Sequence, residues 1–196
     1  MVAMGLARPW AEAFFRLLQT SDVAAGLKEA ALSAALGAWT ERLTRVVVTT
    51  CEALGWRPAA KGHLGDVLPL ARHEYLALDV MAFRAHDPSR WPLPIAVFEL
   101  ENSREEDRIA YALWKVLCIR VPLRAVFAYR RDAREGLTLV HRLAESVIGG
   151  LSIDERMVVT GETALVIGSR GEAETFPSGY FKFRTLNANT GDFERL

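Results

Sequence analysis

The 196-residue chain contains no apolar run that approaches the roughly 18 residues a membrane-spanning helix needs. Its first segment also lacks a basic stretch followed by an uninterrupted apolar one, because Arg8, Pro9 and Glu12 break the pattern. No internal repeat, low-complexity tract or linker is visible. These absences argue against a membrane protein and lead us to expect a cytoplasmic one.

Cysteine is scarce, and neither sign of charge is in excess. Cys51 and Cys118 are far apart, and each sits in an apolar helical pattern, which favours buried free thiols over a disulfide framework or a zinc site. Lys and Arg number 24, as do Asp and Glu, so the formal net charge is zero. A strong attraction of the whole molecule to nucleic acid is therefore not expected, and DNA binding would need a local patch.

The composition is that of a globular protein. Hydrophobic residues make up 51% of the chain and charged residues 24%, which permits one substantial core and excludes intrinsic disorder. We predict a single domain over residues 1–196, because this length is close to the usual size of one domain.

Apolar periodicity predicts helices in the first part of the chain. Residues 9–19 place apolar side chains on one stripe, and residues 22–54 are rich in Ala and Leu, which suggests two further helices, the second over about 36–54. The N-terminal helices thus cover about 9–35. Residues 56–73 hold several Gly and Pro and short apolar pieces such as Val67 and Leu68. We therefore expect a loop with one short strand in this segment.

Nearly continuous apolar runs at 75–83 and 95–100 predict buried strands joined as a hairpin. A helix is expected from a Ser103–Glu106 capping box to about Arg120, followed by a strand over 123–129. The C-terminal part of the chain, 132–187, is predicted to hold a helix and a β-hairpin. The helix covers 132–148, and the strands of the hairpin cover 163–167 and 180–186. This order indicates an α/β sandwich with a mixed central sheet flanked by helices.

Three acidic residues interrupt the two apolar strands. If the hairpin is symmetric about Ser89, Asp79 lies opposite Glu99, and directly opposed Cβ atoms are about 4.5–5.5 Å apart. Glu101 shares the face of Glu99, being two residues further on. Because like charges repel at this distance, a divalent cation such as Mg²⁺ or Mn²⁺ would stabilise the three carboxylates together. The other interpretation is that these acids pair with Arg side chains such as Arg84 or Arg104.

The stretch from LDVMAF through AVFELENS to RIAYALWKVLC and LRAVFAY resembles the core of the PD-(D/E)XK nuclease superfamily over about residues 40–130. This resemblance implies a restriction endonuclease-like fold and Mg²⁺-dependent hydrolysis of phosphodiester bonds, with DNA as the expected substrate. Position by position, Asp79 corresponds to the first acid and Glu99 to the second. Glu101 stands where most members carry Lys, although some restriction enzymes of the superfamily have Glu there.

The family's Lys helps to position water and to stabilise the transition state, so its replacement matters. Lys115, on the helix predicted after the strand over 95–100, is a candidate to supply this missing lysine from a different position. By our count it lies around 17 Å along that helix, which favours a tip that misses the acids and a simpler role as a cation in the last helical turn. We therefore include Lys115 among the candidate catalytic residues but expect no contact with the acids.

Several other polar or aromatic residues are weaker candidates for the site. Glu41 or Glu52 could supply the Glu that the resemblance places on the preceding helix, although surface helices favour Glu anyway. The remaining residues have simpler explanations, namely helix capping for Asn102 and Ser103, loop surface for His63 and His73, and core packing for Tyr111 and Trp114.

A run of arginines between 120 and 134 is the candidate DNA contact, and it could equally be a solvated surface paired elsewhere. It contains Arg120, Arg124, Arg130, Arg131 and Arg134, opposed only by Asp132. The alternative to a nuclease is an inactive protein of the same fold that binds nucleic acid or protein. A third, weaker hypothesis is a homodimer built on the C-terminal hairpin.

Overall fold

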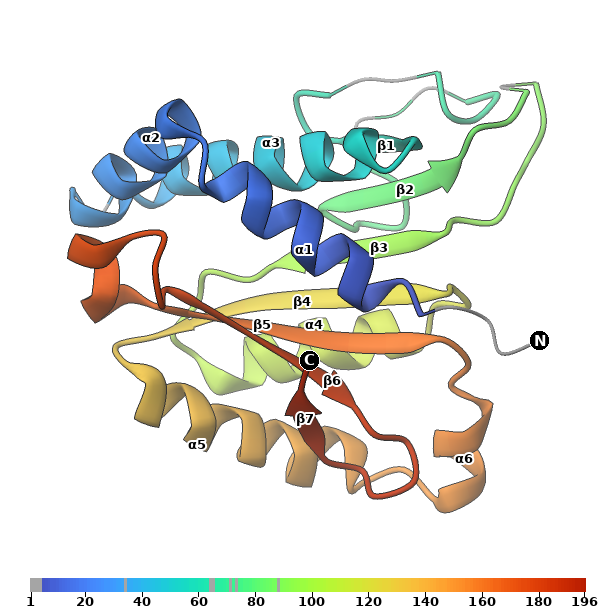
Figure 1. The fold of residues 1–196 in the computed structure, drawn as a ribbon. Helices are drawn as coiled ribbons and strands as arrows, with labels where there is room; N and C mark the ends of the chain where they lie inside the picture. The colour runs from blue at the N-terminus through green and yellow to red at the C-terminus, as the bar shows by residue number, and fades with distance from the viewer. Residues whose placement is uncertain (1–4, 34, 64–65, 71, 73, 88) are drawn as a thin grey trace.

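The computed structural model describes residues 5–33, 35–63, 66–70, 72, 74–87 and 89–196. Within these ranges, seven strands form one mixed sheet in the order of the chain (Figure 1). The strands are β1 (Trp56–Ala60), β2 (Val80–Arg84), β3 (Ala96–Leu100), β4 (Leu123–Arg130), β5 (Glu162–Ser169), β6 (Phe181–Leu186) and β7 (Phe193–Arg195). Neighbours pair antiparallel except β3 with β4 and β4 with β5, which are parallel.

Helices cover both faces of this sheet, so the fold has three layers (Figure 1). The helices are α1 (Ala7–Leu18), α2 (Ser21–Leu32), α3 (Leu36–Ala53), α4 (Glu106–Leu117), α5 (Ala133–Leu143) and α6 (Ile153–Val158). α1, α2 and α3 pack on one face, whereas α4 and α5 pack on the other. The expected α/β class with a mixed, helix-flanked sheet is confirmed. No helix in the described ranges is long and apolar enough to cross a membrane.

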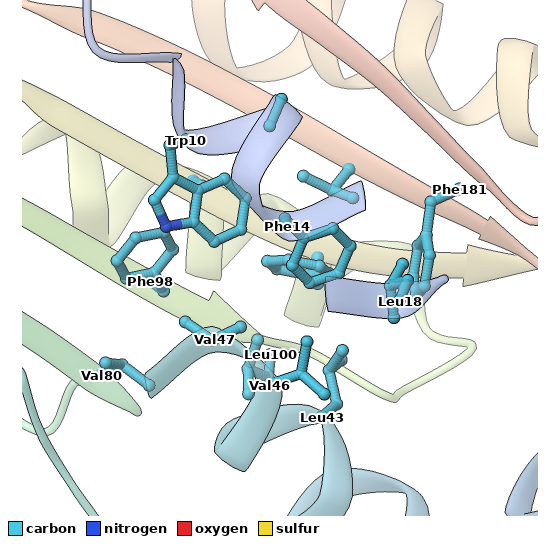
Figure 2. Packing of buried hydrophobic residues seen from close by; sticks show 14 of the residues in the cluster. Trp10, Phe14, Leu18, Leu43, Val46, Val47, Val80, Phe98, Leu100 and Phe181 are labelled. Carbon is cyan, nitrogen blue, oxygen red and sulfur yellow. The ribbon is translucent and has the colours of Figure 1, made fainter. Parts of the chain in front are cut away.

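An aromatic cluster fills the space between α1 and the sheet (Figure 2). The buried indole of Trp10 lies with its centroid 4.8 Å from the ring of Phe98 and 5.1 Å from that of Phe14. The ring centroids of Phe14 and Phe181 are 5.4 Å apart. Each such side chain removes about 150–250 Å² from water, so this cluster is the main link between α1 and strands β3 and β6.

On the opposite face, a single arginine organises the connection between α4 and β4. Arg124 is 1% exposed, and its guanidinium donates to four backbone carbonyls and to the hydroxyl of Thr163. The carbonyls belong to Val116, Ile119, Val121 and Thr160. Burial lowers the pKa of Arg124 by removing water from the cation. Arg124 is thus a structural residue, and its expected part in a DNA-binding patch is wrong.

The Gly- and Pro-rich segment holds one short strand, as predicted. This strand is β1, which begins directly after Gly55, and Val67 and Leu68 are not part of it. The predicted start of the next strand at Tyr75 is wrong. β2 starts at Val80 because Leu76 and Ala77 have positive φ, a conformation incompatible with a strand.

Further differences concern the following helix and the chain's C-terminal part. α4 begins after Glu105, without a side-chain cap, and the hydroxyl of Ser103 accepts from Glu105 N–H, so the expected capping box is absent. Helix α6 and strand β7 were not predicted. Both are short, and β7 has three residues, too few for a periodic signal. Cys51 is buried as expected, whereas Cys118 is exposed.

Candidate active site

The hairpin register brings the first two predicted acids together. Val80 pairs with Phe98 and Met81 with Val97, and extending this register by one residue sets Asp79 opposite Glu99. The Asp79 side chain is also held at this position, because the backbone N–H of Leu100, next to Glu99, donates to Asp79 Oδ2 at 2.7 Å. The expected symmetric hairpin and the juxtaposition of these two acids are therefore confirmed.

Glu99 is a buried carboxylate in an apolar surrounding. It is 7% exposed, and its neighbours along the same face include Val97 and Val126. Its Oε2 lies 2.7 Å from the ammonium of Lys115, whereas the buried Oε1 has no hydrogen-bond partner among the described residues. A buried carboxylate oxygen without a partner is costly, and it marks a position where a ligand would be stabilised.

Burial raises the pKa of Glu99 to about 7. The hydrogen bond from Lys115 lowers this pKa, and the nearby negative charge of Asp79 raises it. The nearby backbone N–H of Asp79 also lowers the pKa of Glu99. No hydrogen bond of standard geometry joins Asp79 and Glu99. A strongly perturbed carboxyl with a specific charged partner is typical of functional sites.

Lys115 reaches the acids, contrary to our expectation that it would miss them. Its ammonium donates to the carbonyl of Ala77 at 2.8 Å in addition to its ion pair with Glu99. The helix begins at Glu106 rather than near Ser103, so Lys115 lies only about 13 Å along it. Helical side chains also lean toward the N-terminus, which carries the ammonium back toward the carboxyl end of β3.

Strained backbone precedes Asp79. Leu76 and Ala77 have φ values of 55° and 52°, and neither is glycine. Such a left-handed conformation costs about 1–3 kcal/mol per residue and persists only where the surroundings impose it. Here the Lys115 hydrogen bond to the Ala77 carbonyl supplies one constraint, so the same lysine holds the turn before Asp79 and the carboxylate of Glu99.

Glu101 does not complete a three-carboxylate cluster. It is half-buried, and its Oε1 accepts a hydrogen bond from Ser103 N–H at 2.7 Å. Across the described ranges, no three His, Cys, Asp or Glu side chains lie close enough together to hold a metal ion. The predicted convergence of Asp79, Glu99 and Glu101 on one ion is therefore wrong, and the Glu101 carboxylate binds the backbone of the loop before α4 instead.

The remaining pair still fits a magnesium ion. Mg²⁺ commonly takes one or two carboxylates from the protein and completes its octahedral shell with waters and substrate phosphates. Asp79 and Glu99 supply two carboxylates side by side, and the unpartnered Oε1 of Glu99 is an available oxygen donor. The donor set is all oxygen, as a hard cation requires.

Other acidic and histidine candidates stand apart from these groups. Glu41 and Glu52 are exposed on α3, and Glu41 pairs with Arg45 one turn further on. His63 closes the turn after β1 through backbone bonds with Ala60. His73 lies outside the described residues.

Three further residues differ from their expected roles. Tyr111 and Trp114, expected in the core, are 60% and 52% exposed on α4, with ring centroids 6.0 Å apart. Tyr111 is one helical turn before Lys115. Asn102 does not cap α4; its amide donates to the hydroxyl of Thr40 on α3, and its Oδ1 is buried without a partner in the described chain.

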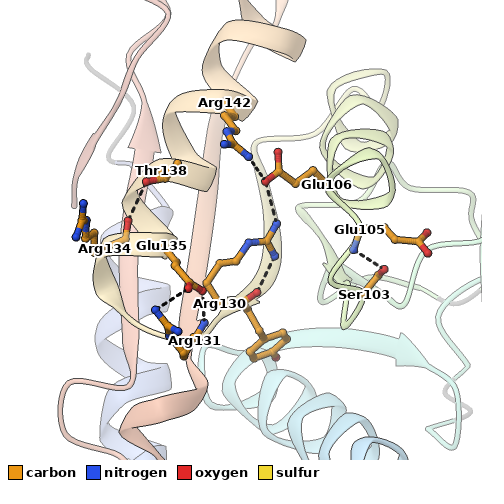
Figure 3. A network of polar contacts seen from close by, with 10 residues as sticks. Ser103, Glu105, Glu106, Arg130, Arg131, Arg134, Glu135, Thr138 and Arg142 are labelled. Atoms are coloured by element: carbon orange, nitrogen blue, oxygen red, sulfur yellow. Dashed lines mark hydrogen bonds and ion pairs between the residues drawn. The ribbon is translucent and has the colours of Figure 1, made fainter.

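The predicted arginine run is divided by the fold. Arg120 precedes β4 and Arg130 ends it, and this eight-residue strand is about 26 Å long. Arg130, Arg131 and Arg134 thus gather at the carboxyl end of the sheet, the end to which β3 also points (Figure 3). Arg120 lies at the opposite end.

Sequence reasoning missed the partners that complete this arginine group. Arg104 follows β3 and Arg170 follows β5, and both line a cavity of about 410 Å³ with Tyr129, Arg130, Arg131 and Glu135. Arg170 donates to the carbonyl of Asn102 at 3.0 Å and stacks over the ring of Tyr129. An arginine after each of three neighbouring parallel strands was the signal, because parallel strands end at one edge.

Comparison of the chain with protein-family models, with curated proteins and with solved structures gave no match.

Proposed function

We propose that this protein is a Mg²⁺-dependent nuclease with a restriction endonuclease-like fold that hydrolyses phosphodiester bonds, with DNA as its substrate. The observation that carries the proposal is the arrangement of Asp79, Glu99 and Lys115. Two carboxylates lie opposite one another at the end of the β2–β3 hairpin, and Glu99, which is buried with an unpartnered oxygen, pairs with a lysine from the next helix. The mixed sheet with helices on both faces also supports this assignment.

The residues divide the chemistry among them. When bound, Mg²⁺ lowers the pKa of a coordinated water and neutralises charge on the scissile phosphate. Asp79 and Glu99 would hold the cation through their carboxylate oxygens. Lys115 favours the ionised form of Glu99, which a cation requires, and brings a positive charge to the position of the substrate phosphate. Glu101, whose carboxylate accepts from the Ser103 backbone, is assigned no part in this chemistry.

Lys115 replaces the lysine missing from the acid-x-Lys position. The ammonium comes from a different element but meets the same carboxylate, 2.7 Å from Glu99 Oε2. Exposed Tyr111 and Trp114 extend from the same helix, where aromatic faces are available to stack on unpaired bases. Together these features favour an active enzyme over an inactive protein of the same fold.

The test is cleavage of supercoiled and linear DNA in Mg²⁺ or Mn²⁺. We expect activity in the native protein, loss of at least about 100-fold in Asp79→Asn and in Glu99→Gln, and full activity in the matched control Glu52→Gln, an exposed acid on α3. Calorimetry should show Mn²⁺ binding that disappears in Asp79→Asn. Retained cleavage in both site variants, or no cleavage and no Mn²⁺ binding in the native protein, would leave the inactive binding module as the better assignment.

A further inference from the structure

We infer that the arginine-lined cavity at the carboxyl end of β3, β4 and β5 binds the phosphate backbone of the nucleic acid beyond the cleavage site. This inference deepens the proposed function by assigning a substrate contact outside the acidic pair. The cavity measures about 410 Å³, and four of its six lining residues are arginines: Arg104, Arg130, Arg131 and Arg170.

Charge at this end of the sheet is unbalanced. This cavity and the adjoining one along α5 together present six arginines against three carboxylates, an excess of three positive charges in a chain whose net charge is zero. Glu106 pairs with Arg130 and Arg142, and Glu135 pairs with Arg131 (Figure 3). The carboxylate of Asp132 also pairs with Arg131. No ion pair involving Arg104 or Arg170 is found in the described ranges, so these two cations are available to an anion.

The cavity wall also contains an unsatisfied donor. Arg130 Nη2 is buried and has no hydrogen-bond partner among the described residues, and its nearest ion pair, with Glu106 Oε1, is long at 3.8 Å. Arg170 is held in place by its hydrogen bond to the Asn102 carbonyl and by the Tyr129 ring beneath it. A guanidinium that is fixed in position and has free N–H groups is suited to phosphate recognition, because its donors match two phosphate oxygens.

The position of the cavity relates it to the acidic pair. Glu99 pairs with Val126 on β4, and Arg130 is four residues further along that strand, about 13 Å away. Phosphates recur every few ångströms along a nucleic-acid strand, so a strand cleaved at Glu99 reaches the arginines within a few nucleotides. The surface therefore reads backbone charge and position rather than base identity.

The experiment measures binding without cleavage. Fluorescence anisotropy of a labelled 20-nucleotide DNA, single-stranded and duplex, is recorded in EDTA over a range of salt concentrations. We expect the double variant Arg104→Ala/Arg170→Ala to bind at least roughly tenfold more weakly, and the slope of log affinity against log salt to become shallower by about 2, one per lost phosphate contact. The control is Arg120→Ala, which removes one exposed positive charge at the other end of β4 and should leave the affinity and the salt slope nearly unchanged.

Unchanged affinity and slope in the double variant, or an equal loss in Arg120→Ala, would overturn the inference. Competition by inorganic phosphate or a mononucleotide distinguishes the source of the ligand. If either displaces DNA at a phosphate concentration equal to that of the oligonucleotide, the cavity binds a free phosphate compound instead of a strand. Asp79→Asn should retain the native salt slope, so a failure of cleavage and a failure of this site are separately visible.

Discussion

Replacement of Glu99 by glutamine should make the stability of the protein less sensitive to pH. Burial holds the pKa of Glu99 at about 7, against 4.5 for a free glutamate, so the native state binds this proton more tightly than the unfolded chain does. The group's contribution to stability is fully present below about pH 4.5 and is lost as the pH rises through about 7. A shift of this size corresponds to about 3 kcal/mol.

Glutamine keeps the shape of the side chain but cannot ionise. The stability of Glu99→Gln relative to the native protein should therefore rise by about 3 kcal/mol between pH 4.5 and pH 8, or about 6–12 °C in melting temperature for a chain of this length. Contributions from all other titrating groups cancel in this difference. The ion pair with Lys115 forms only when Glu99 is ionised, so its effect on the pH-dependent part is already contained in the pKa of about 7.

Urea unfolding followed by circular dichroism in EDTA measures this difference, because the chelator removes ions that would stabilise the carboxylate. The matched control is Glu52→Gln, which removes an exposed acid and should give the same stability difference at both pH values. A difference between Glu99→Gln and the native protein that stays constant from pH 4.5 to 8 would refute the reasoning, because Glu99 would then titrate as an exposed acid does.

Two further predictions concern the rest of the molecule. Arg124→Met should lower the free energy of unfolding by about 3–5 kcal/mol in urea titrations, because several buried carbonyls lose their donor, and a loss below about 1 kcal/mol would contradict that role. Cys118 should react with a thiol reagent in the native state whereas Cys51, buried and with a pKa raised to about 12, should react only after unfolding. Modification of two thiols in the native protein, counted by mass spectrometry, would show that the α1–α3 packing around Cys51 is open.

Much of the sheet could be predicted from local pattern. The apolar runs before Phe83 and Leu100 indicated the β2–β3 hairpin, and its symmetry about Ser89 correctly placed Asp79 opposite Glu99. Register is recoverable in this case because side chains alternate with a period of two and because both strands are buried, so a slip of one residue would turn every apolar side chain to the wrong face.

The position at which α4 starts decides whether Lys115 contacts Glu99. A sequence count of the helix from Ser103 places Lys115 out of reach, whereas the observed start at Glu106 and the lean of helical side chains bring it to Glu99. Helix ends depend on capping contacts that are weak in the sequence, and α4 has no side-chain cap to mark its start.

By itself, then, the sequence determined the α/β class, the hairpin register and the pairing of Asp79 with Glu99, since all three follow from the period of apolar residues along neighbouring segments. Tertiary structure alone decided which cations meet which acids. Lys115 forms an ion pair with Glu99, and Arg124 is buried among backbone carbonyls. Arg104 and Arg170 line one cavity with Arg130, although the three arginines follow or end three different parallel strands. Such encounters depend on how segments distant in the chain pack. Apart from the arginine that follows each of three parallel strands, the sequence contains no local pattern that indicates them.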